Sequence, residues 1–191
     1  MKNRILLVLA MCCARPTFAQ YPPLWIPRPA TKLEIFAART NAVLTTENYF
    51  VPGISGDDGC RVRFQAIIMY ESGQEAQKVR GLKVEIVVPQ QNKEEQSVIS
   101  YVDFEELEPL SRAITTMLDV TQRGTALPNP IAKEVSYTTT GGLTLAMVQR
   151  NKERQLLLTH SSQPGIICAV SQSRTITDLK TSIETAMQEI R

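Results

Sequence analysis

Apolar residues recur at helical spacing in two separate stretches of the chain. In each stretch the steps between them are 3, 4 and 3 residues, which places four side chains on one face of a helix. We therefore predict two amphipathic helices, each with one face in the core. The first set is Leu107, Leu110, Ile114 and Met117, and the second is Ile176, Leu179, Ile183 and Ala186.

Segments in which apolar and polar residues alternate precede each predicted helix. The clearest begins at Cys60, where apolar positions alternate with Arg61, Arg63 and Gln65. A period of two is typical of a strand with one buried and one wet face. The order of four strands and a helix occurs twice, so we predict an α+β fold of two ββββα repeats in a single domain, with antiparallel sheets each packed by a helix. The other strand-like segments are residues 43–51, 82–88, 97–102, 134–139, 143–147, 156–158 and 166–170.

Turn-forming residues divide this domain. Pro52 is expected to end the first strand, and the glycine-rich stretch 53–59 fits a solvated hairpin turn. Gly124 and the proline-containing residues 128–130 mark the boundary between half-repeats at about 41–122 and 131–191. Residues 32–40 have helical spacing and are expected to form a short helix that enters the fold.

Capping residues indicate where the long helices begin. Asp103, with Glu106 three residues later, fits the N-cap of the first helix. Thr175 or Thr177 fits the same position in the second helix. The acidic residues that follow Asp103 lie at the positive end of the helix dipole, so we interpret them as structural rather than as a catalytic carboxylate pair.

The first 19 residues have the features of a secretory signal peptide. Lys2 and Arg4 precede an apolar run at residues 5–14, and residues 17–19 fit a cleavage site. The run is shorter than the roughly 20 residues that span a bilayer. Residues 9–12 also resemble a lipoprotein signal, and a retained membrane anchor is a further alternative. We expect an exported protein, periplasmic or extracellular, with no stable membrane span after cleavage.

A proline-rich segment connects the signal to the domain. Residues 20–30 contain four prolines within eight positions, which exclude helix and sheet and favour an extended tether. A proline-rich recognition peptide is the alternative to a plain spacer. The α+β domain is then expected to cover residues 31–191.

Cleavage changes the charge of the chain. The full sequence has 21 basic and 19 acidic residues, and the signal peptide holds three of the basic residues and no acid. The mature chain therefore carries 18 basic and 19 acidic residues, a formal charge of −1. A nearly neutral surface provides no general field for phosphate backbones or anionic lipid. Nucleic acid is therefore not the expected partner.

Cleavage also removes two of the four cysteines and leaves Cys60 and Cys168. An oxidising compartment allows these two residues to form a disulfide. Both lie on apolar positions of strand-like segments, so two buried free thiols are the alternative. A bridge between them would close a loop of about 100 residues.

Few groups are available for catalysis. His160 is the only histidine, and no motif places a cysteine nucleophile or a pair of zinc ligands beside it. We interpret it as a partly exposed residue at the end of a strand. The chain has no phosphate-binding loop and no dinucleotide motif. We therefore expect no catalytic residue, no cofactor and no metal.

Polar and aromatic side chains on the wet face of the predicted sheets are the best candidates for binding. Basic side chains interleaved with aromatic ones on a sheet can bind single-stranded nucleic acid. Such a face can equally pair two copies of the chain or receive a peptide, and an ordinary solvated face balanced by acids is the alternative. The candidate residues are Arg61, Arg63, Gln65, Lys83 and Tyr101, and Tyr49 and Tyr137 also fall on predicted strands.

The order of motifs carries a resemblance to known proteins. Residues 101–106 read Tyr-Val-Asp-Phe-Glu-Glu and open the first helix, and a Gly141-Gly142 turn follows among the later strands. Over residues 31–191 this order resembles a group of small exported bacterial proteins of unassigned function, in which a Tyr-x-Asp-Tyr-x-Glu-like segment opens the first helix. The doubled ββββα topology is also similar to that of PUR-repeat and whirly proteins, which bind single-stranded nucleic acid. Fold similarity alone does not fix function.

These observations predict an exported, non-enzymatic module. It is expected to bind a protein, a peptide or an envelope component through a sheet face, or to form homo-oligomers through that face. The alternative prediction is single-stranded nucleic-acid binding by a PUR-like fold.

Overall fold

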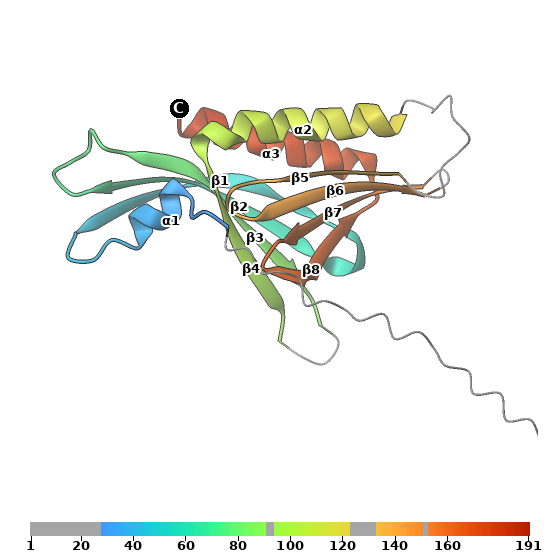
Figure 1. Ribbon diagram of the computed structural model, residues 1–191, viewed down its shortest axis with the longest axis horizontal. Coiled ribbons are helices and arrows are strands. Elements are labelled where there is room, and N and C mark those ends of the chain that lie inside the picture. Colours follow the sequence, from blue (N-terminus) through green and yellow to red (C-terminus); the bar gives the residue numbers. More distant parts are fainter. Residues whose placement is uncertain (1–27, 91–93, 123–132, 151–152) are drawn as a thin grey trace, which may run out of the picture.

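The structure is a computed structural model that describes residues 28–90, 94–122, 133–150 and 153–191 (Figure 1). The predicted signal peptide, residues 20–27 of the predicted tether and the predicted boundary at residues 124–130 lie outside the described residues.

Two repeats of four strands and a helix follow one another along the chain. A short helix, α1 (Lys32–Ala37), precedes them, and a 3-10 turn, η1 (Asp57–Gly59), lies between the first two strands. The first repeat contains β1 (Leu44–Ser55), β2 (Arg61–Glu71), β3 (Val79–Val88), β4 (Gln96–Asp103) and α2 (Phe104–Gln122). The second repeat contains β5 (Lys133–Thr138), β6 (Leu143–Arg150), β7 (Glu153–His160), β8 (Gln163–Val170) and α3 (Ser173–Glu189).

Each repeat forms its own antiparallel sheet. The strand orders are β1-β2-β3-β4 and β5-β6-β7-β8, so every strand pairs with its neighbour in sequence. Short connections suffice for such pairing, because antiparallel neighbours can be joined by hairpins. The predicted α+β fold of two ββββα repeats is therefore confirmed.

A single core joins the two repeats. All eight residues of the predicted helical stripes are at most 2% exposed. They lie in one continuous apolar cluster together with residues from the inner faces of both sheets. The 3-4-3 spacing thus identified the buried faces of both α2 and α3 correctly.

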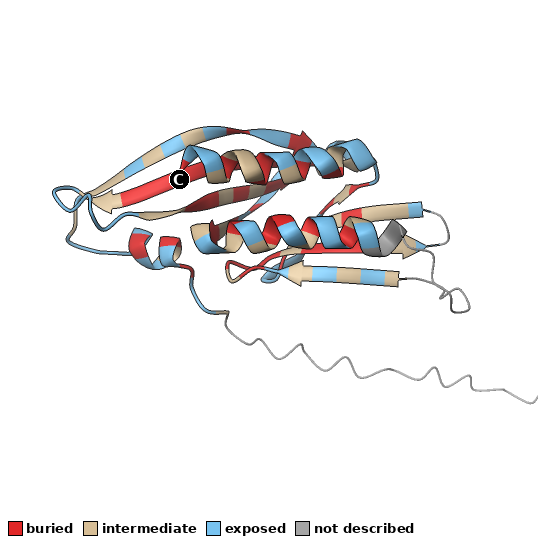
Figure 2. Cartoon of the chain, turned by 90° about the horizontal axis from the view of Figure 1, so that it is seen from above, coloured by how far each residue is buried: buried red, intermediate tan, exposed pale blue. Residues whose placement is uncertain are grey.

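The two long helices lie side by side and run antiparallel (Figures 1 and 2). Helix α3, from the second repeat, packs on β1, β2 and β3 of the first sheet. Helix α2 packs on β5 and β6 and also contacts β3 and β4. Each sheet is covered by a helix, but the first sheet takes its cover from the other repeat. The repeats therefore complete one another instead of closing separately.

The prediction that Pro52 ends the first strand is wrong. Strand β1 continues through Pro52 to Ser55, and its pairing with β2 shifts register between Val51 and Ile54. Because β1 is the edge strand of its sheet, a proline at this irregularity needs no ladder hydrogen bond on its open side.

The predicted helix caps also differ from the structure. Helix α3 begins at Ser173 with Gln172 as N-cap, so Thr175 and Thr177 lie inside its first turns. Asp103 directly precedes α2, as predicted, and its carboxylate accepts the backbone N–H groups of Lys32 (2.8 Å) and Leu33 (3.2 Å) at the start of α1. Caps supplied from distant parts of the chain leave no local sequence signal.

Helix α1 covers part of the outer face of the first sheet, the face turned away from the shared core. Leu33 and Phe36 pack on Ile67 and Met69 of β2 in a second, smaller apolar cluster. This contact explains why the end of β2 is buried on both faces although its first half alternates between buried and exposed residues.

A disulfide connects the two sheets. Cys60, directly before β2, and Cys168 of β8 are bridged, with their Cα atoms 5.5 Å apart. Gly56 lies against the bridge, since a Cβ atom at this position would be 2.6 Å from the Cys60 Sγ and 2.8 Å from the Cys168 Sγ. Beside it, Asp57 accepts a hydrogen bond from the Ser171 hydroxyl at 2.7 Å. The stretch predicted as a solvated turn is thus attached to the end of β8.

Candidate binding face on the first sheet

The five predicted binding residues all project from the outer face of the first sheet. Arg61, Arg63 and Gln65 are the exposed positions of β2, where they alternate with buried residues. Lys83 lies opposite Gln65, and Tyr101 lies opposite Lys83. Residues that face one another across antiparallel strands project to the same side, so the structure brings the predicted set together on one surface.

Phe50 completes a line of side chains across this face. It lies opposite Gln65 on β1, and it is 85% exposed. Phe50, Gln65, Lys83 and Tyr101 therefore form one cross-strand row over all four strands, which we call the Phe50 row. Sequence reasoning missed Phe50, although its neighbour Val51 is buried and the period of two places Phe50 on the opposite face.

The basic residues at the Phe50 row differ in whether they have an acidic partner. Arg63 forms an ion pair with Glu85 at 3.3 Å, and Arg61 pairs with Glu95. Lys83 is half-buried, and among the described residues no carboxylate lies within ion-pair distance of its ammonium group. Of the three predicted basic residues, Lys83 alone has no acidic partner among the described residues.

A depression of about 580 Å³ adjoins the row on the side away from α1. Phe50 and the Arg63–Glu85 pair border it, and helix α1 covers the sheet on the other side of the row, where Tyr101 packs against its cluster. An aromatic ring, an amide, an ammonium group and a phenol can thus meet one extended ligand. The residues that line the depression are Asn48, Tyr49, Phe50, Val51, Gly53, Arg63, Phe64, Gln65, Lys83 and Glu85.

Two of the tyrosines that were grouped with the basic residues lie elsewhere. Tyr49 and Tyr137 pack against the shared core, so they do not belong to the outer face. Tyr49 and Tyr70 both donate hydrogen bonds to the Glu47 carboxylate, at 2.9 and 3.0 Å. These bonds, with that from Tyr49 the stronger influence, lower the pKa of Glu47. Of Tyr49, Tyr101 and Tyr137, only Tyr101 shares a face with the basic residues.

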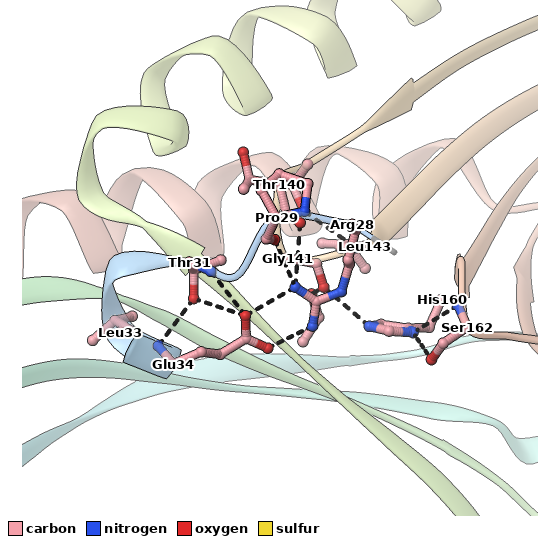
Figure 3. Close-up of polar contacts among 12 residues, drawn as sticks. Arg28, Pro29, Thr31, Leu33, Glu34, Thr140, Gly141, Leu143, His160 and Ser162 are labelled. Atoms are coloured by element: carbon pink, nitrogen blue, oxygen red, sulfur yellow. Dashed lines mark hydrogen bonds and ion pairs between the residues drawn. The ribbon is translucent and has the colours of Figure 1, made fainter. Parts of the chain in front are cut away.

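A polar network holds the start of the described chain against the second repeat (Figure 3). Arg28 makes a double hydrogen bond to the Glu34 carboxylate and also donates to the Thr140 carbonyl at 3.3 Å. The hydrogen bond to Arg28 is the main reason that the pKa of Glu34 is lowered. Glu34 also completes a capping box with Thr31. The first turn of α1 is therefore fixed by charge-assisted bonds.

His160 is buried at the edge of this network, contrary to the prediction that it is partly exposed. It is 3% exposed, and its Nε2 lies 3.0 Å from the Gly141 carbonyl. Its Nδ1 accepts the backbone N–H of Ser162 at 3.2 Å and lies 2.7 Å from the Ser162 hydroxyl. These bonds fit a neutral ring with the proton on Nε2. The histidine joins two hairpin turns, β5–β6 and β7–β8, and this position accounts for its hydrogen bonds without catalysis.

Burial, as the main cause, holds the pKa of His160 below its ordinary value of 6.5. Since the unfolded chain takes up a proton near that value and the folded chain only at lower pH, we expect stability to be lost as the pH falls from about 7 through the folded pKa. Titration of the single histidine resonance by NMR should give a midpoint below 6.5, and urea unfolding should show a lower stability at pH 5.5 than at 7.5.

The His160→Gln variant provides the control for this pH dependence. Its overall stability can differ from that of the wild type, but its stability should change less between these two pH values. A histidine midpoint at or above 6.5, or an unchanged pH dependence in the variant, would contradict the assignment.

Within the described ranges, no group of three or more histidine, cysteine, aspartate or glutamate side chains is placed to hold a metal ion. No helix of the described chain is long and apolar enough to cross a membrane. Comparisons with family models, curated proteins and solved structures found no match to this chain.

Proposed function

We propose that the protein is an exported, non-enzymatic binding module that contacts a protein, a peptide or another envelope component through the outer face of its first sheet. The observation that carries the proposal is the Phe50 row. An aromatic side chain that is 85% exposed stands in line with an amide, a phenol and an ammonium group that has no acidic partner among the described residues. Exposed aromatic residues beside polar groups are typical of binding surfaces.

Support for a non-enzymatic role comes from the positions of the reactive side chains. Both cysteines of the mature chain are in the disulfide, so neither supplies a thiolate nucleophile. Both ring nitrogens of His160 are engaged by the two turns that it joins. The candidate acids Asp103 and Glu106 accept backbone N–H groups, from α1 and from Thr140 respectively.

Single-stranded nucleic-acid binding in the manner of PUR-like folds is the second candidate. The placement of Lys83 between two aromatic residues favours it, because bases stack on aromatic side chains beside basic residues. The acids Glu85 and Glu95, which pair with Arg63 and Arg61, weigh against it. Salt-sensitive retardation of single-stranded DNA by the full mature protein would favour this candidate over the first.

Substitution of Phe50 by alanine tests the proposed binding face. We expect the affinity of the variant for envelope fractions to fall at least about tenfold. An aromatic side chain that becomes buried in a complex commonly dominates the interface. The melting temperature should remain near that of the wild type, since the side chain contributes little to the core. Retention of labelled protein on the fractions, together with thermal unfolding, measures both effects.

Ile167→Ala is the matched control, because Ile167 is a large apolar residue 44% exposed on the second sheet. It should bind as the wild type does. Retention that depends on Ile167 but not on Phe50 would place the binding surface on the second sheet and contradict the proposal. Sedimentation of both variants also tests homo-oligomers, which should dissociate in Phe50→Ala if the same face pairs two copies.

A further inference from the structure

The charge at the Phe50 row is incompletely balanced. Arg61 and Arg63 each have an acidic partner, whereas the half-buried Lys83 has none within the described part of the chain. An ammonium group without an acidic partner can gain a charge-assisted hydrogen bond from a carboxylate that arrives with the ligand. The paired arginines at the same time leave two acidic groups on this face. A ligand with a few well-placed acids therefore suits the face better than a polyanion.

Phe50 sets the second requirement for the ligand. Its ring projects from the edge strand beside the depression that Gly53 and the Arg63–Glu85 pair border. An apolar or aromatic side chain of the ligand can cover the ring and fill this depression. The ligand must therefore present an apolar group over β1 and a carboxylate over β3.

The spacing of the strands determines how far apart these two groups must be. Adjacent strands are about 4.8 Å apart, so Phe50 on β1 and Lys83 on β3 are separated by about 10 Å. A polyproline II chain has three residues per turn and a rise of about 3.1 Å, so residues i and i+3 lie on one side about 9 Å apart. A ligand in the β conformation offers about 7 or 13 Å for residues on one side, which fits less well.

We propose that the ligand of the Phe50 row is an acidic, proline-rich peptide segment that crosses the strands in polyproline II conformation, with an apolar side chain on Phe50 and a carboxylate on Lys83 three residues away. Gln65 stands between these two residues, where its amide can bond the free backbone groups of such a chain. The inference rests on the proposed function, since it assigns a ligand to the same face.

Binding of synthetic peptides to the wild type and to a variant with reversed charge at position 83 tests this assignment. The probe is a fluorescein-labelled proline-rich peptide with Trp and Glu three positions apart, titrated with the full mature protein at low ionic strength and followed by fluorescence anisotropy. We expect the Glu→Gln peptide, and a peptide with Glu moved by one position, to bind at least about fivefold more weakly. The K83E variant should bind the Glu peptide more weakly than the wild type does. It should bind a peptide with Lys in place of that Glu more tightly.

The R174E variant is the control for net charge, because Arg174 is an exposed cation on α3. It should bind the Glu peptide as the wild type does. Equal binding of the Glu and Gln peptides, no effect of K83E, or tighter binding of oligo(dT) than of the Glu peptide would overturn the assignment.

The outcome for the ligand is separable from that for the binding face. If no peptide binds while Phe50→Ala still abolishes retention on envelope fractions, the peptide assignment fails and the proposed function stands. If Phe50→Ala leaves that retention unchanged, the proposed function fails whatever the peptides do.

Discussion

Removal of the Cys60–Cys168 bridge is expected to lower the free energy of unfolding by about 4–5 kcal/mol. The bridge spans 108 residues of sequence, and a cross-link of that length strongly restricts the unfolded chain in the loop-entropy description. The C60A/C168A variant avoids placing two hydroxyl groups in the buried site, where both cysteines are at most 2% exposed. Urea unfolding of the variant and of the oxidised wild type measures the difference.

The reduced wild-type protein is the control for this comparison. If cross-linking causes the effect, reduction should shift the unfolding midpoint in the same direction as the double alanine substitution. A loss below about 1 kcal/mol in both samples would contradict the expected restriction of the unfolded chain by the bridge.

Gly141→Ala is expected to be similarly severe, with a loss of about 3 kcal/mol or more. A Cβ atom at this position would lie 1.7 Å from the Tyr101 backbone oxygen, which cannot move without shifting β4. The Gly141 carbonyl also accepts the Ser100 hydroxyl at 2.8 Å and bonds the His160 ring at 3.0 Å. Displacement of this turn therefore combines steric overlap with the loss of two buried hydrogen bonds.

Gly165→Ala provides the matched comparison in the β7–β8 hairpin. A Cβ atom at Gly165 would meet no heavy atom within 4 Å. Its unfolding free energy should stay within about 0.5 kcal/mol of the wild type, as for most exposed substitutions. Equal stability of the two alanine variants would contradict the close contact of Gly141 in the β5–β6 turn with Tyr101 of β4.

The parts of the fold that depend on local periodicity could be predicted from the sequence. The apolar steps in α2 and α3 and the alternation in β2 follow from the geometry of a single element. The same alternation placed Arg61, Arg63 and Gln65 on one face, and it would have added Phe50 if applied through Val51. The role of these residues in binding stays a prediction.

Features that depend on contacts between distant elements could not be predicted in this way. Asp103 and Glu106 resembled a local helix start, but their carboxylates hold α1 and Thr140. His160 is buried because the β5–β6 turn and the Arg28 segment meet beside it, and neither of these is near β7 in the sequence. Whether Cys60 and Cys168 pair depends on where β8 lies relative to β2, which no residue pattern within either strand contains.

The position of α3 has a consequence for how the chain reaches its native state. The cover of β1, β2 and β3 begins only at Ser173, after the whole second sheet has been synthesised. Until then, apolar side chains such as Val62 and Phe64 have no helix over them, and nascent chains with such surfaces are prone to aggregate or to bind chaperones. Contacts of this sequence separation also slow folding. The first repeat is therefore expected to remain an incomplete intermediate until the second repeat has been made.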